Sequence, residues 1–318
     1  AGAAWREPAV PRAECEQLKI ELLARLEQSR TDPNAIARRA AARAGNPYPP
    51  DDVRYTPTID EEIARVKATD LDAVKAFHAK FYGTPHAEMA IVGDFDAATV
   101  RPLLGQLFGE SHGGAPYARV PQPFYSTKSA PQSFETPDKA NAAMFGRLSM
   151  PLNDQAPDYA SLVVANRVLG GDSDSRMFQR VRVKGGLSYA VGTVFQPASI
   201  DPNSTLVVYA IFAPQNLDKV KMAMAEEIAR AREGGFTAQE IDAAKKAVLE
   251  ERRITRAQDD AVMGSLVAQE YLGRTWAESA RIDAAVAAVT AESASAALRK
   301  YVDPADIAFA YAGDFAKK

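Results

Sequence analysis

The segment Ala79-Lys80-Phe81-Tyr82-Gly83-Thr84-Pro85 is followed shortly by Ala90-Ile91-Val92-Gly93-Asp94-Phe95. Near the end of the chain, Arg299-Lys300-Tyr301-Val302-Asp303-Pro304-Ala305 is followed by Ala310-Tyr311-Ala312-Gly313-Asp314-Phe315. The matching residues are separated by a constant offset of 220 positions, without a gap. Each copy predicts a helix that ends in an aromatic residue, a turn with proline, and a short apolar strand before Gly-Asp. The sequence therefore predicts a structural repeat.

The length of the repeat predicts the domain organisation. A unit of 220 residues that ends near the C-terminus begins near residue 99, and an earlier unit would begin about 120 residues before Ala1. We therefore expect residues 1–108 to be the back part of one repeat, residues 109–134 a Gly-, Pro- and Ser-rich linker, and residues 135–318 a complete C-terminal repeat. The chain starts without Met and without a recognisable signal peptide, so we expect a processed or excised piece.

Periodicity and capping residues predict an α+β fold of sheet packed against helices. Strands are predicted at residues 87–92, 140–150, 188–196, 205–213 and 307–311. Helices are predicted at 14–28, 32–45, 96–108 and 158–169, with a further apolar helical face from Leu217 to Ile228. Thr69 and Asp72 predict a cap for the helix that carries Phe81, and Thr237 with Glu240 predicts a capping box for a long helix reaching about residue 272. 

Composition excludes several classes of protein. The net charge is −3, whereas nucleic-acid binders carry a basic excess. The longest apolar stretch, residues 205–214, is far shorter than the roughly 20 residues that span a bilayer. Cys15 is the only cysteine, so neither an internal disulfide nor a cysteine cluster for a metal is expected.

The chain lacks recognisable catalytic and metal-binding motifs. Its histidines are His78, His86 and His112, and none lies four residues from another, so no helix presents paired imidazoles to a metal. A nucleophile elbow and a phosphate-binding loop are also absent from the sequence. We therefore expect this chain to bind no metal or other cofactor.

The most unusual stretch runs from residue 169 to residue 189 and contains three Arg, one Lys and four Gly. It predicts a glycine hinge, a short basic helix, a second glycine turn and a strand on which Tyr189 alternates with Val191 and Phe195. From spacing alone, the arginines could be solvated helix charges and Tyr189 a core residue, or both could belong to a functional site.

This stretch resembles the C-terminal repeat of the insulinase/pitrilysin family of zinc metallopeptidases. The matching motifs are Leu169-Gly170-Gly171, Ser175-Arg176-Met177-Phe178, Arg182 and Gly186-Leu187-Ser188-Tyr189. A further match is Gly235-Phe236-Thr237 with Glu240 and Ala244-Lys245-Lys246, and the resemblance covers most of residues 10–318. It is strongest to the C-terminal portion of large bacterial members built from four such domains.

The resemblance implies paired repeats that form two halves of a chamber around a peptide. In this family the zinc sits on an H-x-x-E-H helix, but the corresponding helix here carries Leu162, Val163, Val164 and Asn166. Zinc is therefore expected in another domain or subunit, and this chain alone is expected to be proteolytically inactive.

The resemblance also implies site residues. Arg182 and Tyr189 match the Arg and Tyr that reach toward the scissile carbonyl in active members. Both side chains can donate hydrogen bonds to a developing oxyanion. The sequence departs from the family pattern at Gly185, where an acidic residue often stands.

The leading interpretation is thus the non-zinc-binding part of an insulinase-like metallopeptidase. Its expected partners are a peptide or unfolded-protein substrate and a zinc-bearing N-terminal half or partner subunit, with no nucleic acid and no membrane span. One alternative is a catalytically dead structural or peptide-binding subunit of the same family, and another is an unrelated α+β binding module. The periplasm is the expected compartment, because large bacterial members are often exported, with the cytoplasm as the alternative.

Overall fold

The computed structural model describes residues 8–83, 86–109 and 115–316. The chain forms two compact units, each assembled from three stretches of sequence. Residues Ala1–Gln28, Thr58–Val120 and Ile254–Thr275 form what we call the helical unit. Residues Ser29–Pro57, Pro121–Arg253 and Trp276–Lys318 form the sheet unit. Mixed strands and helices in the second unit confirm the α+β fold class.

The sheet unit contains a five-stranded mixed sheet. Its strands are β1 (Gln132–Glu135), β2 (Ala142–Met150), β3 (Ser188–Gln196), β4 (Ser204–Phe212) and β5 (Ala308–Gly313). They lie in the order β1-β5-β2-β4-β3, and only the β1–β5 pair is parallel. The last four strands confirm the predictions, while β1 was not predicted, because its four residues are mostly exposed and show no apolar alternation.

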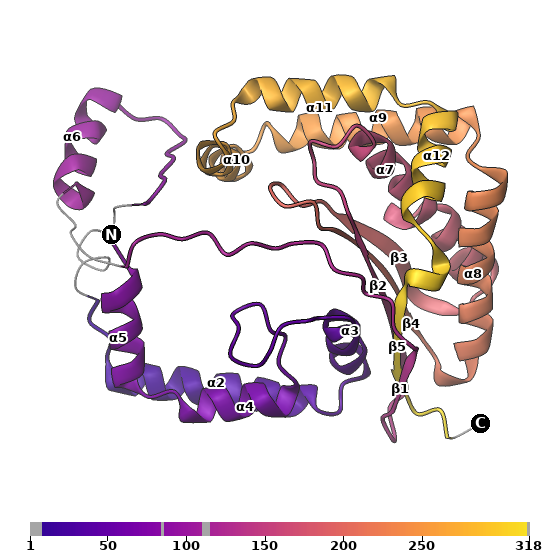
Figure 1. The fold of residues 1–318 in the computed structure, drawn as a ribbon, viewed down its shortest axis with the longest axis horizontal. Helices are drawn as coiled ribbons and strands as arrows, with labels where there is room; N and C mark the ends of the chain where they lie inside the picture. The colour runs from indigo at the N-terminus through magenta and orange to yellow at the C-terminus, as the bar shows by residue number, and fades with distance from the viewer. Residues whose placement is uncertain (1–7, 84–85, 110–114, 317–318) are drawn as a thin grey trace. The chain divides into compact units, whose positions relative to one another are not determined.

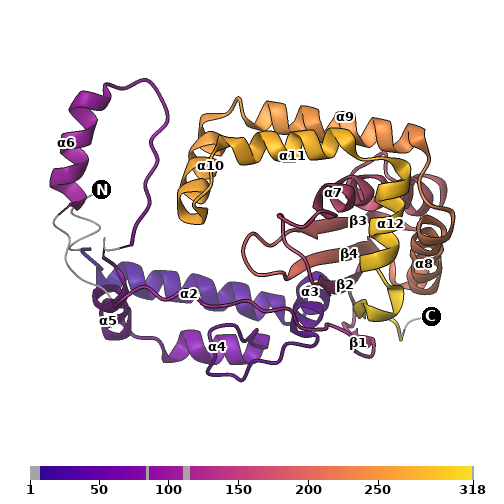
Figure 2. The ribbon, with the colours of Figure 1, turned by 45° about the horizontal axis from the view of Figure 1, so that its top comes forward.

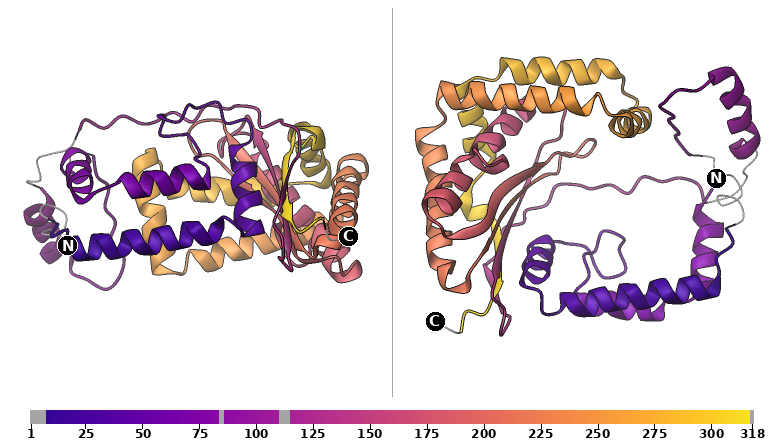
Figure 3. Two further views of the ribbon diagram at one scale, coloured as in Figure 1. Left: turned by 90° about the horizontal axis from the view of Figure 1, so that it is seen from below. Right: turned by 180° about the vertical axis from the view of Figure 1, so that it is seen from behind.

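Helices cover both faces of this sheet (Figures 1 and 3). One face is covered by α7 (Tyr159–Asn166), α8 (Leu217–Gly234), α9 (Ala238–Thr255), α11 (Trp276–Ala288) and α12 (Ala291–Tyr301). Two π-helical segments, η1 (Arg167–Gly171) and η2 (Phe178–Lys184), extend this layer, and the short turns η3 (Pro214–Asn216) and η4 (Pro304–Asp306) precede α8 and β5. The opposite face is covered by α3 (Pro33–Arg43), which begins at the predicted Asp32 cap.

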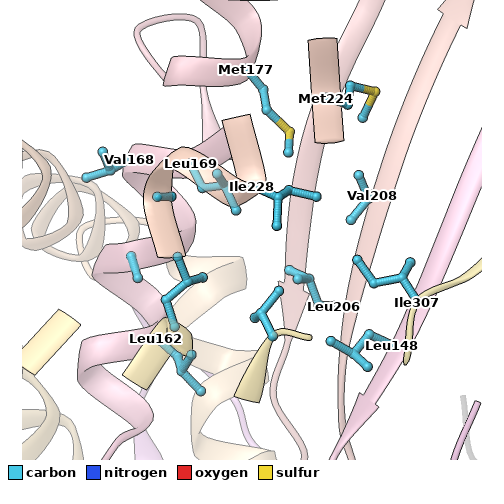
Figure 4. Packing of buried hydrophobic residues seen from close by; sticks show 14 of the residues in the cluster. Leu148, Leu162, Val168, Leu169, Met177, Leu206, Val208, Met224, Ile228 and Ile307 are labelled. Carbon is cyan, nitrogen blue, oxygen red and sulfur yellow. The ribbon is translucent and has the colours of Figure 1, made fainter. Parts of the chain in front are cut away.

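The larger core lies between the sheet and the main helical layer (Figure 4). Leu148, Leu206 and Val208 of the sheet face Met177 and Ile228 of the helices, and all five are buried. Removing a side chain of this size from water contributes roughly 1.5–3 kcal/mol. The smaller core under α3 is built mainly from alanines, which let the helix approach the sheet closely.

The helical unit contains α2 (Arg12–Ser29), α4 (Ile59–Ala68), α5 (Leu71–Phe81), α6 (Ala97–Phe108) and α10 (Asp259–Leu272). The helix α4 was not predicted. The predicted Thr69 cap is wrong: the Asp70 side chain accepts from the Ala73 N–H and caps α5, while Thr69 ends α4. No helix among the described residues is long and apolar enough to span a membrane.

Two pairs of helices, α5 with α12 and α2 with α9, share features between the first and the last parts of the chain. The bounds of α5 and α12 differ by 220 residues at both ends, as the repeat predicted. Lys19 of α2 donates to the carbonyl oxygens of residues 67 and 69 at 2.8 and 2.7 Å. Lys245 of α9 donates in the same way to residues 287 and 289, at 3.3 and 3.0 Å. The helix α9 lies beside α11 (Figure 2), and the hydrogen bonds from Lys245 connect α9 to the C-terminal end of α11.

Two further predictions, of a strand at residues 87–92 and of a long helix from Thr237, are also wrong. Residues 87–92 form no strand among the described residues, because no neighbouring strand there accepts or donates their backbone hydrogen bonds. The long helix predicted from Thr237 is broken between Thr255 and Asp259. Consecutive acidic residues, Asp259 and Asp260, start the new helix α10, where negative charge is favourable.

Candidate functional site

The glycine hinge at residues 170–171 allows a helix to lie directly on β3. A Cβ atom on Gly170 would fall 2.7 Å from both the backbone nitrogen and the Oγ1 of Thr193. A Cβ on Gly192 would likewise fall 2.7 Å from the carbonyl oxygen of Gly170. The Leu-Gly-Gly motif therefore has a packing role: it brings η1 against the strand that carries Tyr189.

Arg176 belongs to a nearly buried ion pair and not to a solvated helix face. Its side chain is 12% exposed, and its Nε and Nη2 each donate to the Glu240 carboxylate at 2.7 Å. Its Nη2 also donates to the carbonyl oxygen of Gly235 at 3.0 Å. This bidentate contact lowers the pKa of Glu240 from 4.5 to about 2. The predicted capping box also forms, since Glu240 N–H donates to Thr237 Oγ1 at 3.2 Å and Thr237 N–H to the Glu240 carboxylate at 2.9 Å.

The turn after η2 depends on a glycine. Gly186 has a φ of +58°, a conformation that side-chain-bearing residues rarely adopt. Its N–H donates to the carbonyl oxygen of Arg182 at 3.1 Å, and the N–H of Leu187 donates to that of Val181 at 2.9 Å. The turn therefore returns the chain directly beside Arg182 as β3 begins.

Tyr189 sits on a β-bulge at the start of β3. Ser188 pairs with Phe212 and Ala190 with the adjacent Ile211, so Tyr189 is an extra residue in the strand. Its side chain is 73% exposed, whereas Val191 is 4% exposed. The prediction that Tyr189 shares one face with Val191 is therefore wrong, because the bulge breaks the two-residue alternation. The core interpretation of Tyr189 is excluded.

Arg182 lies against Tyr189. Its guanidinium carbon is 5.3 Å from the ring centre of Tyr189 and 5.2 Å from that of Phe178. Its Nη1 donates to the carbonyl oxygen of Tyr189. These contacts hold an exposed guanidinium beside an exposed phenol, both of which can donate hydrogen bonds to a ligand. Phe178 was identified from the sequence only as part of a motif, although its position four residues before Arg182 on the predicted helix is a spacing that brings two side chains together.

The helix that would carry the family's zinc motif does not fit a metal. Leu162 is 3% exposed and Val164 is fully buried, and neither has a ligating atom. Asn166 follows them with a buried amide oxygen that has no hydrogen-bond partner among the described residues. A single amide cannot replace the imidazole and carboxylate ligands that zinc requires.

The histidines do not gather into a site within the part of the chain that the structure describes. His78 stacks on Tyr82 with ring centres 4.7 Å apart, and His86 stacks on Tyr117 at 3.9 Å. His112 lies outside the described residues. Across residues 8–83, 86–109 and 115–316, no group of three or more His, Cys, Asp or Glu side chains could hold a metal ion.

Comparison with known proteins places this geometry in a family. Residues 69–248 match the family model "Peptidase M16 inactive domain". The chain is similar to an uncharacterized zinc protease of Streptomyces coelicolor, with 26% identity over 74% of the chain and 52% of that protein. It is also similar to the uncharacterized zinc protease YmxG of Bacillus subtilis, with 22% identity over 55% of the chain and 41% of that protein. The chain thus spans about half the length of the curated relatives it matches.

Solved structures share the fold. A peptidase M16 inactive domain from Pseudomonas fluorescens aligns with a TM-score of 0.83 at 21% identity, over 98% of this chain and 73% of that chain. A protease from Helicobacter pylori aligns with a TM-score of 0.80 at 13% identity, over 98% and 74%. The periplasmic protease PqqL from Escherichia coli aligns with a TM-score of 0.67 at 17% identity, over 94% and 32%. The resemblance drawn from the motifs is confirmed, and the chain belongs to the peptidase M16 inactive-domain family of zinc-protease-like proteins.

Proposed function

We propose that this chain is the non-zinc-binding part of a peptide-hydrolysing M16 enzyme and lines one side of its peptide chamber. Relatives named as zinc proteases support the reaction class, and the zinc-motif helix of this chain has no suitable ligands. We propose accordingly that zinc is held by another domain or subunit. The proposed organisation is two repeats, with residues 1–108 as the back part of one, 109–134 as a linker and 135–318 as the other.

Arg182 and Tyr189 are the proposed substrate contacts. The observation that carries this proposal is the bulge, which turns Tyr189 out of the core while Arg182 is held against its ring. Hydrogen-bond donors that are fixed before the reaction stabilise charge that grows on a carbonyl oxygen in the transition state. The substrate class is a peptide or an unfolded protein segment, because a scissile carbonyl is the group that such donors would contact.

Turnover by the assembled enzyme tests this role. Tyr189→Phe removes the phenol hydroxyl, and Arg182→Ala removes the guanidinium. Each should lower kcat by roughly 10²–10³-fold, as the loss of an oxyanion donor does. Because the contact matters more in the transition state than in the ground state, KM should change much less than kcat. Arg180→Ala is the matched control, since Arg180 lies on the same helix but pairs with Glu226 at 3.1 Å on the surface.

The outcome separates two functions. Full activity of both variants would refute the proposed contacts. Complete absence of activity in the assembly, with its zinc-bearing part present, would favour a structural or peptide-binding subunit.

The proposed compartment is the periplasm, supported by the shared fold of the periplasmic protease PqqL. Fractionation of cells that express the parent protein tests the compartment.

A further inference from the structure

Side chains hold the backbone on both sides of the bulge at Tyr189. The carbonyl oxygen of Leu187, just before β3, accepts a hydrogen bond from the Asn216 side chain at 3.0 Å. The carbonyl oxygen of Ala190, just after the bulge, accepts one from the Ser188 hydroxyl at 2.7 Å. A bulge interrupts the strand ladder, so backbone acceptors near it need other donors. The direction in which the Tyr189 side chain leaves the sheet therefore depends on these two donors.

Asn216 uses its side chain differently from most asparagines at its position. It is the N-cap residue of α8, where the side-chain oxygen of asparagine ordinarily accepts a hydrogen bond from the first turn of its own helix. Within the part of the chain that the structure describes, the Asn216 side chain caps no N–H group of α8. Its Nδ2 donates instead to Leu187, which connects the segment after β4 to the residue before β3. Stabilisation of α8 alone does not account for this geometry.

Ser188 bridges the bulge from within the strand. Its half-buried hydroxyl donates to the carbonyl oxygen two residues further on, so this hydrogen bond spans Tyr189. Asn216 fixes the chain before Tyr189, and Ser188 fixes it afterwards. Because Arg182 donates to the carbonyl oxygen of Tyr189 itself, the backbone that these two residues fix is also the backbone that Arg182 contacts. The two donors therefore determine how the guanidinium and the phenol lie relative to each other.

We propose that Asn216 and Ser188 are positioning residues for the Tyr189 phenol and the Arg182 guanidinium. Both act on backbone carbonyl oxygens beside Tyr189 and not on the substrate. A displacement of about 1 Å in a group that contacts the reacting atoms can lower the rate by roughly 100-fold. The expected effect on turnover rests on the proposed function, whereas the expected effect on the position of Tyr189 does not.

Asn216→Asp separates positioning from helix capping. Aspartate has nearly the same size, caps helices as well as asparagine does, and carries a negative charge that is favourable at a helix N-terminus. Its carboxylate has no hydrogen to donate to the carbonyl oxygen of Leu187. A role in capping α8 therefore predicts native activity, whereas positioning predicts that kcat of the assembled enzyme falls by roughly 10–100-fold with little change in KM. Gln215→Ala is the matched control and should keep the native kcat, because Gln215 is exposed on the same turn.

Ser188 and a double variant test the same role independently. Ser188→Ala removes the hydroxyl and should lower kcat by roughly tenfold, whereas Ser188→Thr keeps a donor in a residue that suits a strand and should restore it. If Asn216 acts through the phenol, Asn216→Asp should change kcat much less in a Tyr189→Phe chain than in the native chain. Effects that simply multiply in the double variant would indicate general structural damage and overturn the proposal.

Fluorine NMR measures the position of Tyr189 without reference to turnover. In the chain labelled with 3-fluorotyrosine, the Tyr189 signal is the one that Tyr189→Phe removes. Asn216→Asp and Ser188→Ala should each shift and narrow this signal, because the ring leaves the Arg182 guanidinium, whose carbon is 5.3 Å from the ring centre. The signal of Tyr311, which is 7% exposed, should stay unchanged and show that the fold is intact.

The outcomes separate this proposal from the proposed substrate contacts. Native Tyr189 signals in both variants would overturn the positioning role. If Tyr189→Phe leaves kcat unchanged, the substrate contact is refuted, and the fluorine signals alone decide whether Asn216 and Ser188 position the ring. If Asn216→Asp also disturbs the Tyr311 signal, the comparison of Ser188→Ala with Ser188→Thr decides, and equal Tyr189 signals in these two variants would overturn the proposal.

Discussion

Replacing Glu240 with Gln tests how much the Arg176 ion pair contributes to folding. The native carboxylate accepts two hydrogen bonds from a guanidinium that is only 12% exposed, while Glu240 itself is 31% exposed. Glutamine keeps the length of the side chain and can still complete the capping box with Thr237. The substitution therefore removes the negative charge and one of the two oxygens that accept from Arg176.

The expected magnitude follows from the pKa. A pKa that falls from 4.5 to about 2 corresponds to roughly 3.4 kcal/mol of preference for the charged form in the folded state. Because about a third of the side chain is exposed, solvent screening reduces this figure, and we expect Glu240→Gln to lower the free energy of unfolding by about 1–2 kcal/mol at pH 7.

The direction of the pKa shift also predicts how the stabilisation by Glu240 changes with pH. The pKa is depressed by folding, so the stabilisation is fully present above pH 4.5 and is lost as the pH falls toward about 2. Urea unfolding of both proteins at pH 7 and near pH 2.5 should therefore give a difference that shrinks toward zero in acid. Glu250→Gln is the control, because Glu250 pairs with Arg253 on an exposed helix surface. A Glu240→Gln protein as stable as the native chain at pH 7, or a difference that is independent of pH, would contradict the ion-pair argument.

Three further predictions concern packing, helix pairing and metal content. Gly170→Ala should lower the free energy of unfolding by roughly 1–3 kcal/mol through overpacking, whereas Gly171→Ala, whose Cβ would lie no closer than 3.1 Å to a neighbour, should cost less in the same urea experiment. Lys245→Met should destabilise the sheet unit by about 1–2 kcal/mol, because two carbonyl oxygens lose their charged donor. Lys19→Met should destabilise the helical unit for the same reason. Amide exchange, measured separately for the residues of each unit, checks both variants. The purified chain should contain no stoichiometric zinc by elemental analysis and should cleave no unfolded peptide, and chelator-sensitive cleavage by the chain alone would oppose this.

Local sequence signals predicted most of the elements. Asp32 and Pro33 begin α3, as expected from an N-cap residue followed by proline, and the Asp32 side chain accepts from the N–H groups of Asn34 and Ala35. Gly235 ends α8 with a φ of +69°. These features depend on interactions within one turn of the chain, so the sequence contains all the information that they need.

Features that depend on distant partners could not be predicted in this way. Residues 87–92 have the apolar composition of a strand, but a strand exists only where another strand completes its hydrogen bonds. The bulge at Tyr189 depends on how Ser188 and Ala190 pair with β4, and alternation in β3 alone predicts the wrong face. The two units each group stretches that are far apart in the sequence, and this grouping depends on tertiary contacts that a linear repeat does not specify.

The motif from residue 169 to residue 189 separates into residues that build the site and residues that can act in it. Gly170 permits the contact with β3, Arg176 just before η2 pairs with Glu240 of α9, and Gly186 forms the turn that returns the chain to Arg182. Substitution of any of these three would change both stability and the position of Tyr189, so activity loss alone would not identify a catalytic role. Arg182 and Tyr189 are exposed, and neither fills the core. They are therefore the positions in this motif where a loss of kcat at unchanged stability would point to contact with the substrate.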